Sequence, residues 1–203
     1  MGGEPAHIAN LKRVTRAEPT RDHLEDLEKE LYTQGNDRAT AILYGTFVET
    51  SLRRLLETKI RDDLSSADRK KIWEYEGPLG SFSPKTIMAY ALRLIGPMSR
   101  GDLDLIRLLR NEFAHSRVSF NFATPEVADI CARLQIVDQP QTSIPLGYLD
   151  KSPESEMENA RNIAHPRTRY IAACHNLAFR MLLKRGGYPQ AGDPVFPNDE
   201  PLP

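Results

Sequence analysis

The residues whose types and spacing could carry chemistry gather in one short segment, Arg110 to His115, which reads Arg-Asn-Glu-Phe-Ala-His. It combines a permanent cation, an amide and a titratable imidazole within about two turns of a helix. A guanidinium binds phosphate through a planar fork of donors, and an imidazole exchanges protons near neutral pH. RNA cleavage without a metal uses these groups, because the 2'-hydroxyl must lose a proton beside a phosphate that gains charge. We therefore take Arg110, Asn111 and His115 as candidate catalytic residues.

The helical positions around this segment predict a polar strip. Asn111 and His115 are four residues apart, so they share one face of a helix. Asp104 and Arg107 continue that face toward the N-terminus as supporting residues, and Arg110 lies at its edge. A simpler interpretation stays open, since a histidine near a helix C-terminus is favoured by the helix dipole and a solvated polar strip needs no function.

One histidine cannot easily serve both ends of an in-line displacement, which needs a base for the 2'-hydroxyl and an acid for the leaving oxygen. A twofold dimer that sets two polar strips face to face would supply both groups. We therefore expect a homodimer with the Arg110 to His115 segment at its interface.

Three further positions are candidates for supporting roles. Glu49 lies in the apolar stripe of a long helix, where a carboxylate is costly unless it is paired. Arg107 or Arg110 could supply the pair, or Glu49 could lie partly exposed at the rim of the stripe. Ser83 and Lys85 follow a glycine-rich turn at a helix start, where free N–H groups could bind an anion, although ordinary capping explains the same residues.

The elements that must position these residues are predicted to be helices, because apolar residues recur at helical spacing along most of the chain. The segment from Val118 to Phe122 is too short for more than a loop or a lone extended segment, and 138–156 is expected to be a long loop. The helices are expected over 20–34, 37–60, 66–73, 84–95, 99–115, 125–134 and 166–184, with Asn36 or Asp37 as the cap of the longest. This pattern predicts an all-α antiparallel helical bundle.

Composition bounds the class of protein. The 203 residues fit one helical domain over 19–185, with a flexible arm at 1–18 and a proline-rich tail at 186–203. A net charge of -1 excludes a global attraction to DNA. The sequence contains no membrane span, signal peptide or metal-ligand spacing, so we expect a cytoplasmic protein without metal or cofactor. Cys131 and Cys174 fall in apolar helical patterns and are expected to be reduced core thiols.

The motif Arg110-Asn111-x3-His115 resembles the signature of HEPN domains, helical bundles that include many metal-independent ribonucleases and that typically form dimers. Flanking segments are similar to the bacterial mannitol-operon-repressor family over about residues 36–135. The segments that carry this resemblance are Gly77-Pro78-Leu79-Gly80-Ser81-Phe82-Ser83-Pro84-Lys85, Ala89-Tyr90-Ala91-Leu92, Asp102-Leu103-Asp104-Leu105-Ile106-Arg107 and Arg110-Asn111-Glu112-Phe113-Ala114-His115-Ser116.

The two resemblances imply different functions. The HEPN signature implies an endoribonuclease of the toxin or defence type that uses Arg110 and His115 on RNA. The repressor family implies a non-enzymatic regulator of transcription. We find no helix-turn-helix with a basic recognition helix, so such a regulator would act through a protein partner or through a local basic patch on DNA.

Overall fold

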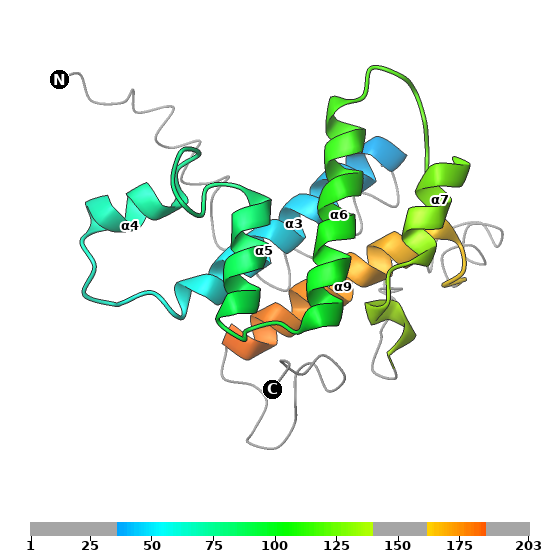
Figure 1. The fold of residues 1–203 in the computed structure, drawn as a ribbon. Coiled ribbons are helices and arrows are strands. Elements are labelled where there is room, and N and C mark those ends of the chain that lie inside the picture. The colour runs from blue at the N-terminus through cyan, green and yellow to red at the C-terminus, as the bar shows by residue number, and fades with distance from the viewer. Residues whose placement is uncertain (1–35, 140–161, 186–203) are drawn as a thin grey trace, which may run out of the picture.

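The computed structural model describes residues 36–139 and 162–185, and within these ranges every regular element is a helix (Figure 1). The elements are α3 (Asp37–Glu57), α4 (Ser66–Trp73), α5 (Phe82–Ala91), α6 (Pro97–His115), α7 (Pro125–Ala132), the 3-10 helix η1 (Ile136–Asp138) and α9 (Pro166–Arg185). The expected all-α class is confirmed. No described helix is long and apolar enough to cross a membrane. The expected arm at 1–18, the helix at 20–34, most of the loop at 138–156 and the tail at 186–203 lie outside the described residues.

Two pairs of helices cross one another in this fold (Figure 1). The helices α3 and α9 pack together and run in the same direction, since near their N-terminal ends the Tyr170 hydroxyl donates to the Ala41 carbonyl at 2.8 Å and Arg167 pairs with Asp37 at 3.2 Å. The helices α5 and α6 lie side by side and antiparallel. The expected antiparallel packing is confirmed for α5 and α6, because a short connection joins them. The helices α3 and α9 are separated by many residues, so their connection does not determine whether they pack parallel or antiparallel.

Most helix starts follow the expected capping residues. The Asn36 side chain accepts from the Ala39 N–H at 2.9 Å and begins α3, and Ser65 accepts from the Asp68 N–H at 3.1 Å and begins α4. The helix α7 begins at Pro125. These starts were predictable because each places a side-chain acceptor or a proline where the first N–H groups lack partners.

Two expected starts are wrong by two residues. The helix α5 begins at Phe82 and not at Pro84, so Ser83 lies within its first turn. The helix α6 begins at Pro97 and not at Ser99, because a proline suits the first helical position as well as it suits a helix end. Leu92 and Ile95, expected inside the helix before α6, lie beyond the end of α5 at Ala91.

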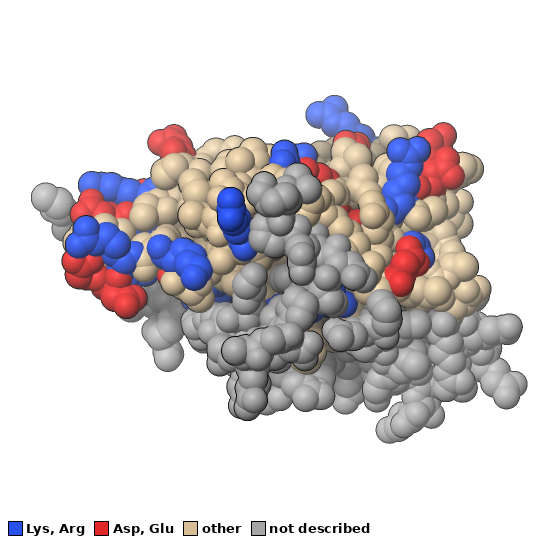
Figure 2. Space-filling model, turned by 60° about the horizontal axis from the view of Figure 1, so that its bottom comes forward, with Lys and Arg blue, Asp and Glu red and all other residues tan. Residues whose placement is uncertain are grey.

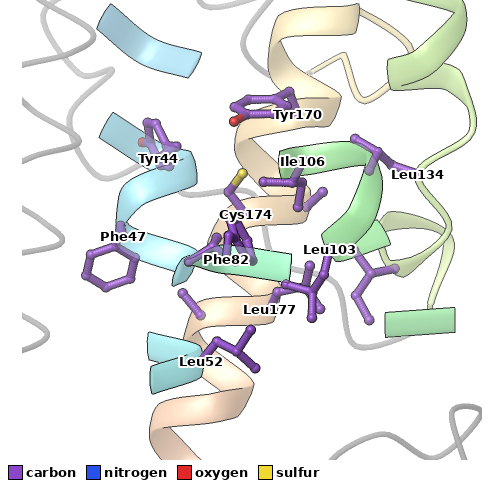
Figure 3. Packing of buried hydrophobic residues seen from close by; sticks show 14 of the residues in the cluster. Tyr44, Phe47, Leu52, Phe82, Leu103, Ile106, Leu134, Tyr170, Cys174 and Leu177 are labelled. Atoms are coloured by element: carbon purple, nitrogen blue, oxygen red, sulfur yellow. The ribbon is translucent and has the colours of Figure 1, made fainter. Parts of the chain in front are cut away.

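The core fills the space between the two pairs of helices (Figure 3). It draws on every described helix, and its members include Val48, Leu52, Phe82, Leu103, Ile106, Cys174 and Leu177. A row of aromatic rings then links the end of α6 to α9, because Phe122 lies 5.1 Å from Phe113 and 5.2 Å from Tyr170 between ring centroids. The segment that carries Phe122 is a loop, as expected. Cys131 and Cys174 are free and buried, which confirms the prediction for the cysteines.

Candidate functional site

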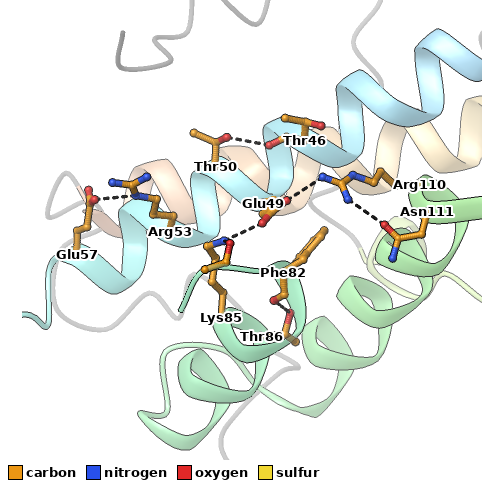
Figure 4. Close-up of polar contacts among 11 residues, drawn as sticks. Thr46, Glu49, Thr50, Arg53, Glu57, Phe82, Lys85, Thr86, Arg110 and Asn111 are labelled. Carbon is orange, nitrogen blue, oxygen red and sulfur yellow. Dashed lines mark hydrogen bonds and ion pairs between the residues drawn. The ribbon is translucent and has the colours of Figure 1, made fainter. Parts of the chain in front are cut away.

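The candidate site is built where α6 crosses α3, and a glycine makes the crossing close. A Cβ atom placed on Gly45 would lie 2.8 Å from both Cβ and Cγ of Arg110, and 3.1 Å from the Tyr170 hydroxyl. The stem of Arg110 therefore lies directly against the backbone of α3. From there its guanidinium reaches Glu49, which is one helical turn beyond Gly45 on the same face of α3 (Figure 4).

Glu49 ties three helices together (Figure 4). Its Oε1 accepts from Nζ of Lys85 on α5 at 2.7 Å, and its Oε2 accepts from Nη2 of Arg110 on α6 at 3.2 Å. The exposed fractions of the three side chains are low, at 16% for Glu49, 6% for Lys85 and 28% for Arg110. Removal from water weakens screening, so each of these charges depends on its partners more than a surface charge does.

Asn111 completes this group, which we call the Glu49 cluster: Glu49, Lys85, Arg110 and Asn111. The Asn111 Oδ1 accepts from Nη1 of Arg110 at 2.9 Å. Both terminal nitrogens of Arg110 are thus bound within the protein. The sequence places Asn111 among the candidate catalytic residues on the same face as His115, and the structure directs its amide oxygen to Arg110.

The sequence left open whether Glu49 pairs with an arginine, and the structure shows that it does. Arg110, and not Arg107, is its arginine partner. Lys85 is a second partner that sequence reasoning missed, because the pair joins positions 36 residues apart. Two cations surround one carboxylate, so the cluster keeps one positive charge in excess.

Ser83 and Lys85, the candidate anion-binding residues, do not place a free ammonium group at the start of α5. The Lys85 ammonium is buried and binds Glu49 and the Gly80 carbonyl, the latter at 3.3 Å. Because α5 begins at Phe82, Ser83 is also not the residue that caps the helix. The charged group of Lys85 is therefore paired with a carboxylate of the chain itself.

The other residues of the polar strip of α6, Asp104, Arg107 and His115, lie outside this cluster. Asp104 pairs with Arg107 at 3.7 Å, and both side chains are partly exposed. His115 is the last residue of α6 and is exposed, and within residues 36–139 and 162–185 its ring has no hydrogen-bond partner. Arg110 and His115 therefore face different surroundings, because Arg110 turns toward α3 while His115 faces solvent.

The chain that follows His115 is held by the start of α3. Arg38 donates from Nη1 to the Ser116 carbonyl at 3.1 Å and from Nη2 to the Val118 carbonyl at 3.3 Å. Asp37 accepts from the Phe122 N–H at 2.9 Å. These contacts fix the C-terminal end of α6, and sequence reasoning missed them because they join residues about 80 positions apart.

A second buried carboxylate was also missed. Asp102 on α6 is fully buried and accepts from the N–H groups of Gln135, at 2.9 Å, and Ile136, at 2.7 Å. It holds the start of η1 in place. Its helical spacing with Ile106 and Leu109 was the available signal, because it puts a charged residue on the buried face. Among the described residues, no group of three or more potential ligands could hold a metal ion.

Comparison with known proteins finds a solved structure of similar fold. No protein-family model matches the sequence, and no curated protein shows a significant match. A chain of the X-ray structure of the MtlR-HPr complex from Escherichia coli is similar in fold, with a TM-score of 0.57 and 20% sequence identity. The alignment covers 77% of this protein and 97% of that chain. The fold therefore resembles that of the mannitol operon repressor.

The charges on the surface are mixed. On the face drawn in Figure 2, basic and acidic side chains of the described residues occur together at both ends of the molecule, and single charged side chains lie between them. Nucleic-acid-binding surfaces usually gather their cations into one patch or stripe. The described residues of that face therefore form no continuous cationic path for a phosphate backbone.

Proposed function

We propose that this protein is a non-enzymatic transcriptional regulator of the mannitol-operon-repressor type, which acts by binding a protein partner. The main support for this proposal is that the Arg110 guanidinium already binds Glu49 and Asn111 within the Glu49 cluster. A ribonuclease of the HEPN type would need this guanidinium on the phosphate. To reach a phosphate, Arg110 would have to leave Glu49, and the partly buried carboxylate would lose one of its two cations.

The structure with a similar fold indicates what kind of partner to test. That structure is a complex with the protein HPr, and 97% of the matched chain is aligned with this one. A neutral overall charge and a mixed surface fit recognition of a protein better than recognition of DNA. We therefore propose HPr as the first partner to test.

The partner experiment is a calorimetric titration of the full chain with purified HPr, unphosphorylated and phosphorylated. The expected result is saturable binding of one of the two forms, with a heat that depends on temperature because apolar surface is buried. An absence of binding by both forms would overturn the proposed partner.

The enzymatic alternative is tested with RNA in the presence of a chelator. The variant to compare is His115→Ala, because His115 is exposed and its removal leaves the Glu49 cluster intact. Arg110→Ala is less informative, since it also breaks a contact between α3 and α6. The expected result is no cleavage by either protein. Cleavage that is lost in His115→Ala and on a 2'-deoxy substrate would overturn the regulator proposal.

A further inference from the structure

The helix α5 buries a charged residue and exposes large apolar ones. Its lysine, Lys85, is 5% exposed, whereas Ile87 is 56%, Met88 40% and the following Leu92 46% exposed. Surface helices normally turn apolar residues to the core and charges to water. These three apolar residues lie in the segment 84–95, which their spacing predicted as a helix, and the structure turns them outward.

We call the surface formed by Ile87, Met88 and Leu92 the α5 outer face. Positions 87, 88 and 92 fall on one side of the helix, because they differ by at most about 140° around its axis. Single exposed apolar residues are common, but a contiguous row of large ones marks an interaction surface. In Figure 1, α5 lies at the front of the molecule beside α6, and no described element covers it on that side.

The two ends of the α5 outer face carry opposite charge. The turn before α5 contains Glu76 and Tyr75, which are exposed, the latter to 91%. The other end carries Arg93, exposed directly after the apolar residues, and Arg100, whose guanidinium lies 4.7 Å from the centre of the Tyr90 ring. The acidic turn and the basic end are separated by the ten residues of α5, which span about 15 Å.

Arg93 occupies a backbone position that usually belongs to glycine. Its φ is 55°, and the Leu94 N–H bonds to the Ala89 carbonyl at 2.9 Å, as in a helix end of the Schellman type. A non-glycine residue is strained in this left-handed conformation. The strained residue therefore lies at the basic end of the α5 outer face, where it places an exposed arginine side chain.

We propose that the α5 outer face binds the same face of a second copy of this chain. The two α5 helices pack antiparallel across a twofold axis, with Ile87, Met88 and Leu92 of both copies at the centre. Antiparallel packing sets the acidic turn of each copy beside the basic end of the other. Parallel packing would bring like charges together, so charge decides the direction. This proposal is independent of the regulator function proposed above.

The test exchanges charges across the twofold axis and measures association by sedimentation equilibrium. In the Arg93→Glu variant, the introduced carboxylate of each copy would face Glu76 of the other, and in Glu76→Arg two arginines would meet. Each variant alone is expected to weaken self-association at least about tenfold, because each dimer contains two like-charge contacts. An equimolar mixture of the two variants is expected to form a heterodimer, because the introduced carboxylate of one copy then meets the introduced guanidinium of the other.

Controls separate this interface from general effects of charge. Arg133→Glu and Asp129→Arg change exposed residues of α7 or its end, outside the α5 outer face, and are expected to leave association unchanged. Arg93→Gly relieves the left-handed strain, so it is expected to raise the unfolding midpoint while it weakens association. A wild-type chain that stays monomeric up to the solubility limit overturns the proposal. The proposal is also overturned if neither charge variant weakens association, or if the mixture of the two variants fails to associate.

Discussion

The backbone of Gly45 lies in contact with the side-chain stem of Arg110, so that a Cβ on Gly45 would meet Cβ and Cγ of Arg110 at 2.8 Å. Two helices approach this closely only where one of them lacks a side chain. The contact sets the direction in which Arg110 leaves α6 and so delivers its guanidinium to Glu49. The motif residue that looked catalytic in the sequence is therefore part of a contact between helices.

Gly45→Ala is expected to destabilise the protein by about 1–3 kcal/mol, because the added methyl overlaps the Arg110 stem and approaches the Tyr170 hydroxyl. Helix propensity alone predicts the opposite sign, a gain of about 1 kcal/mol. Gly101→Ala is the matched control, since Gly101 is also helical and a Cβ there meets nothing within 4 Å. Urea unfolding should show the two alanines changing stability in opposite directions. A stabilising Gly45→Ala would show that α3 and α6 are not in close contact.

Removal of the Glu49 carboxylate is expected to cost more than removal of Lys85. Glu49→Ala leaves the buried Lys85 ammonium without its carboxylate, at a cost of about 3–5 kcal/mol. Lys85→Met leaves Glu49 with Arg110 and fills similar volume, so its cost is expected to stay below about 1.5 kcal/mol. The measurement is the free energy of unfolding in urea.

The double variant tests whether the two residues are coupled. If Lys85 depends on Glu49, the combined change is expected to cost at least about 1 kcal/mol less than the sum of the single changes. Additive costs would show that the Glu49–Lys85 pair contributes little. A circular dichroism spectrum of each variant confirms that the helices are intact before the energies are compared.

Much of this fold could be predicted from the sequence, because helix extents follow local patterns. The caps at Asn36 and Ser65 were predictable from single positions, and the pairing of Glu49 with an arginine was one of the two interpretations that the sequence allowed. The burial of Lys85 was not, since it depends on a carboxylate 36 residues away. The same dependence turned Ile87 outward: once Lys85 faces Glu49, the opposite side of α5 must face away. Local periodicity predicts which side of a helix is buried, but an ion pair with a distant residue can turn a different side toward the core.

Asp102 is expected to be needed for the position of η1. Asp102→Asn replaces one carboxylate oxygen by an amide NH2 group, which cannot accept from the N–H group of Gln135 or Ile136. The expected cost is about 2–3 kcal/mol, as for hydrogen bonds to a buried charge. Hydrogen exchange at Gln135 and Ile136 should become faster in the variant. Asp104→Asn is the control on the same helix, because Asp104 is 45% exposed, and it is expected to change stability by less than about 0.5 kcal/mol. Unchanged exchange in Asp102→Asn would mean that η1 is held by other contacts.

The buried thiols are expected to be unreactive in the folded protein and to make it sensitive to alkali. Burial raises the pKa of the Cys131 thiol to about 12 and that of Cys174 well above its ordinary value. Because the thiolate is the reactive form, a thiol reagent at pH 8 should label neither cysteine until the chain is unfolded. Rapid labelling of the native protein would contradict the burial of both side chains.

The sign of the pH effect follows from the direction of these shifts. The unfolded chain loses the Cys131 proton near its ordinary pKa of 9.0, whereas the folded protein keeps it until about 12. The folded state thus binds more protons between these values, and its stability is full below pH 9 and falls as the pH rises toward 12. The expected slope is about 1.4 kcal/mol per pH unit for this thiol. In Cys131→Ala, the free energy of unfolding in urea should therefore fall less steeply between pH 9 and pH 11. The loss of stability that the substitution itself causes does not change with pH and leaves this slope unaffected. An unchanged slope would show that Cys131 ionises equally in both states.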